Sequence, residues 1–227
     1  MVSYYWEDLI DGKIPSDCTE LYCDFRQINE LPELPQTLIY LDCHCNDLNE
    51  LPELPLTLKT LSCANNNLSS LPELPQTLID LGCHYNNLSY LPELPQTLKY
   101  LWCGYNRINE LPELPQTLID LLCNNNNLNE LPELPQTLKI LRCNNNNLNN
   151  LPELPQILKF LYCDHNKLNE LPELPQTLQI LWCNNNNIKY LSHANCQIIK
   201  KLINYYLTNN PFSANFNSSK EFISSLE

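Results

Sequence analysis

The sequence predicts an α/β-class solenoid of stacked coils, with a parallel β-sheet on the concave face and extended polyproline-type segments on the convex face. A twenty-residue unit recurs in phase eight times from residue 31 to residue 190, and such a period is typical of stacked repeats. Within each unit an alternating apolar segment, such as Leu38 to Leu48, favours a half-buried strand. Two prolines three residues apart, as at Pro32 and Pro35, exclude a helix from the return segment.

The predicted elements follow the chain in three parts. Residues 1–30 form an N-terminal cap with one degenerate repeat, and residues 3–10 are expected to form a short lid over its first coil. Residues 31–190 hold the eight full repeats, so nine strands are expected in all. Residues 191–227 form a helical C-terminal cap and tail: apolar spacing predicts a helix over 192–207 with Ser192 as its N-cap, and a second short helix over 219–226.

The inward positions of the repeat are nearly invariant, and they include a column of asparagines and a column of cysteines. We expect the asparagine amides to satisfy buried backbone groups at the turns. Parallel strands hold the cysteine Cβ atoms about 4.8 Å apart, too far for a disulfide, and a straight ladder cannot surround a zinc ion. The cysteines are therefore interpreted as small buried hydrophobic residues in a reducing compartment. The column comprises Cys23, Cys43, Cys63, Cys83, Cys103, Cys123, Cys143, Cys163 and Cys183.

Charge and motifs narrow the possible functions. The formal charge is −13, which disfavours binding to nucleic acid or to anionic membranes. The N-terminus lacks a basic segment followed by an apolar one, and no apolar run reaches the length of a membrane span. An intracellular, cytoplasmic protein is therefore expected. No Cys-His-Asp set is placed for nucleophilic catalysis, so we predict no enzyme, no catalytic residue, no metal site and no cofactor. Whether the recurring carboxylates at Glu33 and its equivalents bind cations is left open.

The outward positions of the strands differ between copies, and aromatic, apolar and arginine side chains gather there. Such a composition is typical of interaction sites, although the β-propensity of aromatic residues alone also favours them on strands. We expect the residues around Trp102 to form an aromatic cluster that an apolar band continues toward the C-terminus. The predicted partner-binding residues are Tyr85, Tyr100, Trp102, Tyr105, Leu122, Ile140, Arg142, Phe160, Tyr162, Ile180 and Trp182.

The repeat Leu-Pro-Glu-Leu-Pro-Gln-Thr-Leu-x-x-Leu-x-Cys-x-x-Asn-x-Leu resembles the short twenty-residue leucine-rich repeat of the bacterial YopM and IpaH type. In its high content of Asn, Ile and Cys, the repeat is still more similar to the repeats of uncharacterised leucine-rich-repeat proteins from mimivirus-type giant viruses. The resemblance implies a non-enzymatic module that binds a partner protein or peptide on the concave sheet, with a host-cell protein as one expected partner and the host cytoplasm as the location if the chain is viral. The alternatives are the targeting part of an effector with ubiquitin-ligase-linked activity, and a self-associating structural rod. The sequence leaves the oligomeric state open.

Overall fold

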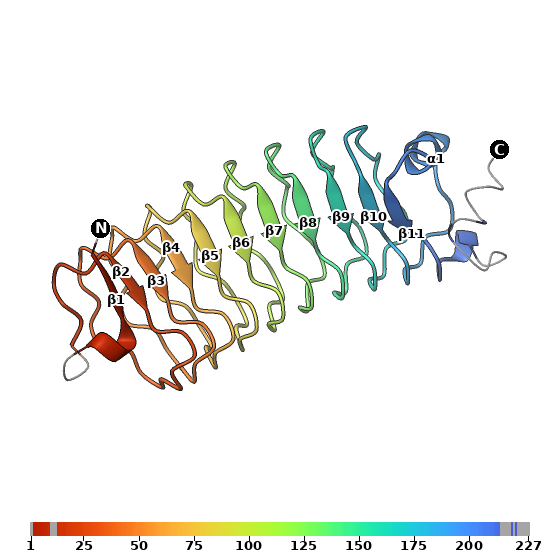
Figure 1. The fold of residues 1–227 in the computed structure, drawn as a ribbon. Coiled ribbons are helices and arrows are strands. Elements are labelled where there is room, and N and C mark those ends of the chain that lie inside the picture. Colours follow the sequence, from red (N-terminus) through yellow and green to blue (C-terminus); the bar gives the residue numbers. More distant parts are fainter. Residues whose placement is uncertain (1, 10–12, 214–218, 220, 222–227) are drawn as a thin grey trace. The chain divides into compact units, whose positions relative to one another are not determined.

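Each repeat folds in the same way in the computed structural model, which describes residues 2–9, 13–213, 219 and 221 (Figure 1). A three-residue strand is followed by a turn, and the proline-rich return segment is neither helix nor strand. The chain forms two compact units, residues 1–108 and 109–227. The first contains β1 (Ser3–Tyr5), η1 (Trp6–Asp8), β2 (Glu20–Tyr22), β3 (Tyr40–Asp42), β4 (Thr60–Ser62), β5 (Asp80–Gly82) and β6 (Tyr100–Trp102). The second contains β7 (Asp120–Leu122), β8 (Ile140–Arg142), β9 (Phe160–Tyr162), β10 (Ile180–Trp182), α1 (His193–Ile199), β11 (Asn204–Tyr206) and η3 (Pro211–Ser213).

Neighbouring strands within each unit are parallel and in register, so equivalent residues of successive repeats lie side by side. Tyr40 pairs with Thr60, and Thr60 pairs with Asp80. The central residue of each repeat strand points inward and is fully or almost fully buried, as Leu41 and Leu61 show. The flanking strand residues point outward and form a surface that we call the strand face. The predicted parallel-sheet solenoid is thus confirmed.

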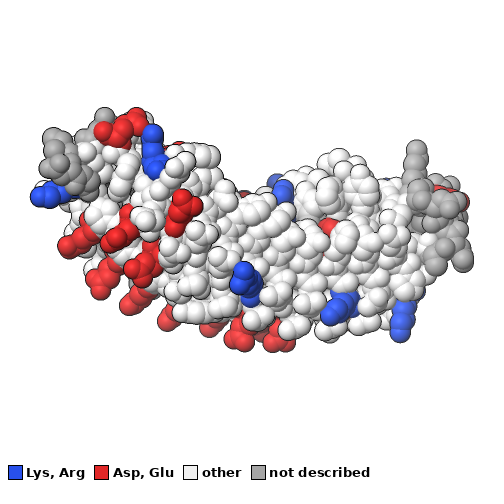
Figure 2. Space-filling view, turned by 90° about the horizontal axis from the view of Figure 1, so that it is seen from below, with Lys and Arg blue, Asp and Glu red and all other residues white. Residues whose placement is uncertain are grey.

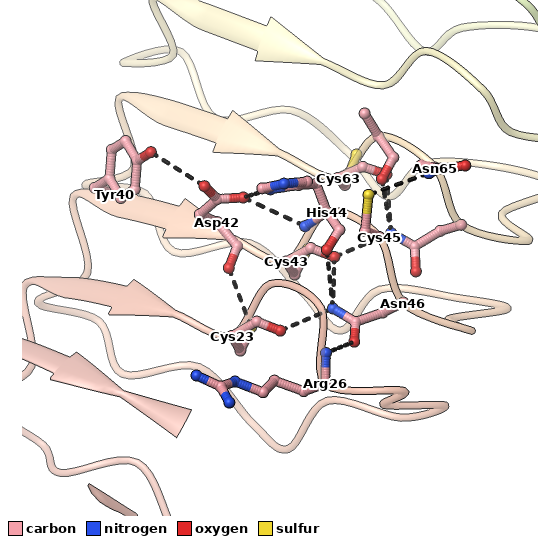
Figure 3. Close-up of polar contacts among 12 residues, drawn as sticks. Cys23, Arg26, Tyr40, Asp42, Cys43, His44, Cys45, Asn46, Cys63 and Asn65 are labelled. Atoms are coloured by element: carbon pink, nitrogen blue, oxygen red, sulfur yellow. Dashed lines mark hydrogen bonds and ion pairs between the residues drawn. The ribbon is translucent and has the colours of Figure 1, made fainter. Parts of the chain in front are cut away.

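The side chains of the asparagine column supply hydrogen bonds to buried backbone groups that would otherwise have no partner. Asn46 accepts hydrogen bonds at its Oδ1 from the backbone N–H groups of Arg26 and Ile28, both at 3.0 Å. Its amide nitrogen donates to the carbonyls of Cys23 at 2.8 Å and Cys43 at 3.0 Å (Figure 3). One side chain therefore ties two successive coils together, as predicted from the spacing of the asparagines.

A threonine ladder performs a similar task on the return segments. The Thr97 hydroxyl lies 2.8 Å from the carbonyl oxygen of Gln76 and 2.7 Å from that of Leu78. The same geometry recurs at Thr37, Thr57, Thr77, Thr137 and Thr177.

The seventh full repeat departs from this ladder, because Ile157 occupies the threonine position with a 41% exposed side chain and no hydroxyl. Replacing Ile157→Thr should raise the free energy of unfolding by about 1 kcal/mol, since it restores one hydrogen bond and removes exposed apolar surface. Urea unfolding at constant slope measures the gain. The reverse change at an intact rung, Thr97→Ile, should cost a similar amount, and equal stabilities for all three chains would contradict this role of the hydroxyl.

The N-terminal segment was wrongly expected to be a lid. Residues Ser3–Tyr5 instead form β1, which pairs in parallel with β2 from Ser3 opposite Glu20 to Tyr5 opposite Tyr22. The 3-10 helix η1 follows it, and residue 10 lies outside the described part of the chain. The physical reason is that the edge of a parallel sheet presents unpaired backbone groups, and the adjacent chain satisfies them by adding a strand.

The C-terminal helix is shorter than predicted. Ser192 is its N-cap, as expected, and accepts a hydrogen bond from Asn195 N–H at 3.1 Å. The helix ends at Ile199, however, and Asn204–Tyr206 forms β11 beside β10, so the prediction of helix up to residue 207 is wrong. Apolar spacing alone is compatible with a helix up to residue 207 and with a short helix followed by a strand. In the structure Ile199 and Leu202 are buried, whereas Ile203 is 78% exposed. The helix predicted over 219–226 falls mostly on residues outside the described part.

Beyond α1 the chain makes one more rung of the repeat. Asn210 takes the place of a ladder asparagine: its amide donates to the carbonyls of Cys183 at 2.9 Å and Leu207 at 3.0 Å, and its Oδ1 accepts from Ile188 N–H at 3.2 Å. Helix α1 is fixed to the preceding repeat by Asn195, which accepts from Leu174 N–H and donates to the Pro172 carbonyl. Within the described residues, no helix is both long and apolar enough to cross a membrane.

Candidate functional site

The strand face of the first unit has a recess between two groups of large side chains. Across β3 to β6 one outward column runs Tyr40, Thr60, Asp80 and Tyr100, and the other runs Asp42, Ser62, Gly82 and Trp102. In each column two small or short side chains are followed by a large aromatic one. The result is a cavity of about 280 Å³, whose lining also includes His84.

Two tyrosines stand in the turns that follow β5 and β6. The backbone φ angles of Tyr85 and Tyr105 are 54° and 55°, in the left-handed region that bulky residues rarely adopt. Their rings stack at 4.1 Å between centroids with 13° between planes. Both side chains are exposed, and a hydrogen bond with Tyr105 is the main cause that raises the pKa of Tyr85. Five equivalent turns hold asparagine in the same conformation: Asn65, Asn125, Asn145, Asn185 and Asn209.

In the second unit, an arginine and three aromatic rings contact one another on consecutive strands. The guanidinium carbon of Arg142 lies 4.8 Å from the centroid of the Tyr162 ring. Trp182 meets Tyr162 edge to face at 5.0 Å and Tyr206 in the same manner at 5.0 Å. The Trp182 indole nitrogen is buried and has no hydrogen-bond partner in the described residues. This row continues from β8 to β11.

The predicted binding residues all lie on the strand face or in the turns beside it, but they are exposed to different degrees. Trp102, Tyr85 and Tyr105 are exposed, at 43%, 47% and 43%. Tyr100 lines the recess, and the stacked pair Tyr85–Tyr105 sits in the turns rather than on the strands. In the second unit Arg142 is exposed, whereas the apolar and aromatic members of the predicted band are half-buried: Leu122, Ile140, Phe160, Tyr162, Ile180 and Trp182.

The predicted set of binding residues leaves out several residues of this surface. Tyr40, Asp80 and His84 line the recess, and Tyr206 ends the aromatic row of the second unit. The first three could have been found by reading large and small residues across neighbouring repeats at one position. Tyr206 could have been found from the segment Tyr205 to Asn210, whose pattern matches Leu181 to Asn186 at a spacing of 24 residues.

Comparison with protein-family models and with curated proteins finds no match. Solved structures do match. YopM from Yersinia pestis has a TM-score of 0.82 and 35% identity over 88% of this chain and 57% of that one. YopM from Yersinia enterocolitica has a TM-score of 0.75 and 33% identity over 88% and 48%. The chain is a leucine-rich-repeat solenoid, similar to YopM. It spans about half the length of these YopM chains.

Two further bacterial leucine-rich-repeat structures extend the comparison. A Shigella effector leucine-rich-repeat domain has a TM-score of 0.62 and 28% identity, over 85% of this chain and 82% of that one. The functional domain of InlJ from Listeria monocytogenes, described as including a cysteine ladder, has a TM-score of 0.72 and 28% identity over 87% and 45%. Leucine-rich-repeat solenoids are in general protein-interaction scaffolds that present one extended surface.

The cysteines and histidines of the leucine-rich repeats do not converge on a metal site. His44 Nδ1 lies 2.5 Å from a carboxylate oxygen of Asp42, Cys45 accepts a hydrogen bond from the Asn65 amide at 3.1 Å, and Cys43 is buried in the core (Figure 3). The three side chains of the Cys-His-Cys segment thus have separate surroundings. Among the described residues, no group of three or more His, Cys, Asp or Glu side chains could hold a metal ion.

Charge is unevenly distributed between the two units. Residues 1–108 carry 15 acidic and 5 basic residues, for a net charge of −10, whereas residues 109–227 carry 11 and 8, for −3. On the face drawn in Figure 2, acidic side chains gather over the first unit. A partner that contacts the first unit therefore meets a strongly negative field, which favours basic surfaces.

Proposed function

We propose that the chain is a non-enzymatic protein-binding module that holds a partner protein or peptide on its strand face. The observation that carries the proposal is the pair Tyr85 and Tyr105. Both occupy a left-handed turn position that costs a bulky residue about 1 kcal/mol or more, and the chain fills five equivalent positions with asparagine and three with Phe25, Cys45 and His165. Two exposed rings held at such positions are best explained by contact with a partner.

The neighbouring side chains support the same role. Trp102 is exposed one strand away from the recess floor, and Arg142 is exposed above Tyr162 in the second unit. Trp, Tyr and Arg carry most of the binding energy in typical protein interfaces, because they combine large apolar area with hydrogen-bonding groups. The half-buried residues around them would act as a supporting rim that excludes water.

The likeness to YopM and to a Shigella effector domain makes a host-cell protein a reasonable partner class. The proposal places the chain in a reducing, intracellular compartment, because its described cysteines are all free thiols. The relationship to giant-virus repeat proteins stays a prediction from the amino-acid composition of the repeat. No contact among the described residues favours the alternatives of a ubiquitin-ligase-linked effector or a self-associating rod.

A selection experiment tests the proposal. A random peptide library is displayed and enriched on the intact chain, and the affinities of the enriched peptides are then measured by fluorescence anisotropy. The double variant Tyr85→Asn, Tyr105→Asn should weaken them by about tenfold or more, since two exposed aromatic contacts are lost. Asparagine suits the left-handed turn, so the melting temperature should stay close to that of the parent chain.

Two further variants bracket the result. Trp102→Ala with Tyr162→Ala removes one outward ring from each unit and should also weaken binding. Gln76→Ala, an exposed change on the return segments, should leave the affinity unchanged. Peptides that bind the tyrosine variant as tightly as the parent chain, or that respond only to Gln76→Ala, would contradict a binding role for the strand face.

A further inference from the structure

The recess on the first unit is shaped by an alternation of large and small residues across four strands. Tyr40 on β3 bounds it on one side, and Tyr100 and Trp102 on β6 bound it on the other. Between them β4 and β5 contribute Thr60, Ser62 and Gly82. Strands spaced about 4.8 Å apart leave a gap of roughly 14 Å between β3 and β6, which the small residues do not fill. The opening is therefore wide enough for one long side chain.

A carboxylate lies at the centre of this recess. Asp80 is half-buried and accepts a hydrogen bond from the Thr60 hydroxyl at 3.4 Å. Burial raises the pKa of its carboxyl, and the Thr60 hydrogen bond and the charge of Lys99 oppose that effect only in part. Among the described residues, Asp80 has no ion-pair partner within 4.0 Å.

A histidine is a further polar residue in the lining. The Nδ1 atom of His84 is buried, and no hydrogen-bond partner for it exists in the described part of the chain. Burial, with a smaller contribution from His44, lowers the pKa of His84, so its imidazole is neutral at physiological pH. A neutral imidazole nitrogen can accept a hydrogen bond. The recess thus offers aromatic walls and one carboxylate beside a neutral histidine, and it lies in the unit with a net charge of −10.

We propose that this recess receives an arginine side chain of the bound partner, an inference that rests on the proposed function. A guanidinium group stacks on aromatic faces and donates several hydrogen bonds in fixed directions, so it can serve Asp80 and the rings together. The chain contains the same type of contact where Arg142 lies over Tyr162 at 4.8 Å. An apolar side chain would desolvate Asp80 without pairing it, and an acidic one would be repelled.

Binding of a small probe tests the recess directly. N-acetyl-arginine amide is titrated into the isotope-labelled full chain, and the backbone amide of Gly82 and the indole N–H of Trp102 are followed by NMR. We expect saturable shifts of both signals at millimolar concentration. N-acetyl-citrulline amide has nearly the same shape without the charge, and should bind at least about tenfold more weakly. N-acetyl-lysine amide, a point charge without a planar group, should fall between the two.

Two variants assign the effect to the recess. Asp80→Asn keeps the size of the side chain and should weaken arginine binding about tenfold or more. Gly82→Val adds a side chain to the floor, and its Cβ would make an ordinary contact at 3.8 Å from Trp102 Cε3. This variant should abolish the shift of Trp102 without lowering the melting temperature, because valine suits a strand better than glycine. Glu73→Gln, exposed on the return segments, is the matched charge control.

The outcomes separate this inference from the proposed function. Equal binding of the arginine and citrulline probes, an unchanged affinity in Asp80→Asn, or no shift at Gly82 would each overturn the arginine recess. If the displayed peptides still depend on Tyr85 and Tyr105 in that case, the strand face remains the binding surface and only the recess is rejected. Enriched peptides should contain arginine, and their affinity should fall in Asp80→Asn but not in Glu73→Gln.

Discussion

Raising the pH above about 9 should unfold the chain, because its core is built on a column of thiols that can ionise only when they reach water. Burial raises the pKa of Cys23 and Cys103 from 9.0 to about 12. Burial also raises the pKa of Cys63 and Cys83 well above 9.0, and neighbouring cysteines of the column add to that rise. Eight column cysteines show this upward shift: Cys23, Cys43, Cys63, Cys83, Cys103, Cys143, Cys163 and Cys183.

The sign of the effect follows from the direction of these shifts. The folded state keeps its protons at a pH where the unfolded state loses them, so the stability of the fold is complete below the unfolded pKa of 9.0 and falls as the pH rises toward 12. Above that pH, each buried thiol lowers the free energy of unfolding by about 1.4 kcal/mol per pH unit. Eight thiols together approach roughly 10 kcal/mol at one pH unit above 9, which is comparable to the whole stability of a typical domain.

Urea unfolding at a series of pH values measures this loss. Cys63→Ala removes one column thiol and should reduce the dependence of stability on pH by about one proton, or roughly 1.4 kcal/mol per pH unit. Asn67→Ala changes an exposed residue that carries no thiol and should leave that dependence unchanged. Burial beside Asp42 also raises the pKa of Tyr40 to about 12, so part of the alkaline loss belongs to this tyrosine. A stability that stays constant through this pH range would refute the thiol ladder as a titrating core.

The repeat made the inward half of the structure predictable. Residues such as Leu41, Cys43 and Asn46 recur every twenty positions, and a stacked parallel coil gives each of them one possible environment. The ends were less predictable, because the period changes there. The residues of β11 lie 24 positions after those of β10, since α1 replaces the proline-rich return segment. Apolar spacing alone could not distinguish a longer helix from a short helix followed by a strand.

The sequence predicts which residues point outward from the strands. It does not predict how exposed each of them is, or the shape of the surface that they form. Register places Tyr100 and Trp102 on one strand, yet a residue's exposure depends on the size of its neighbours on adjacent strands. Ile140, Phe160 and Ile180 are therefore half-buried against one another rather than exposed. The recess arises because Gly82 has no side chain beside the large ring of Trp102. This difference in size appears only when neighbouring repeats are compared. The left-handed turns at Tyr85 and Tyr105 bring these two rings into contact with each other, in the turns rather than on the strands.

The asparagine ladder should be the most sensitive polar element of the fold. Asn66 accepts a hydrogen bond from Leu48 N–H at 3.0 Å and donates to the carbonyls of Cys43 at 3.0 Å and Cys63 at 3.1 Å. Replacing Asn66→Ala leaves these groups buried without that partner, and also leaves a small cavity. We expect a loss of about 2–4 kcal/mol in the free energy of unfolding.

The adjacent residue provides a matched control, because Asn67 is exposed whereas Asn66 is only 8% exposed. The same change, Asn67→Ala, should therefore alter stability by less than about 0.5 kcal/mol. Asn66→Asp should be at least as damaging as Asn66→Ala, since a carboxylate cannot donate to the two carbonyls and would bring a charge into the core. Urea unfolding of the three variants decides the point. Equal losses at the two positions would show that the buried amide does not hold successive coils together, and that leucine packing alone maintains their register.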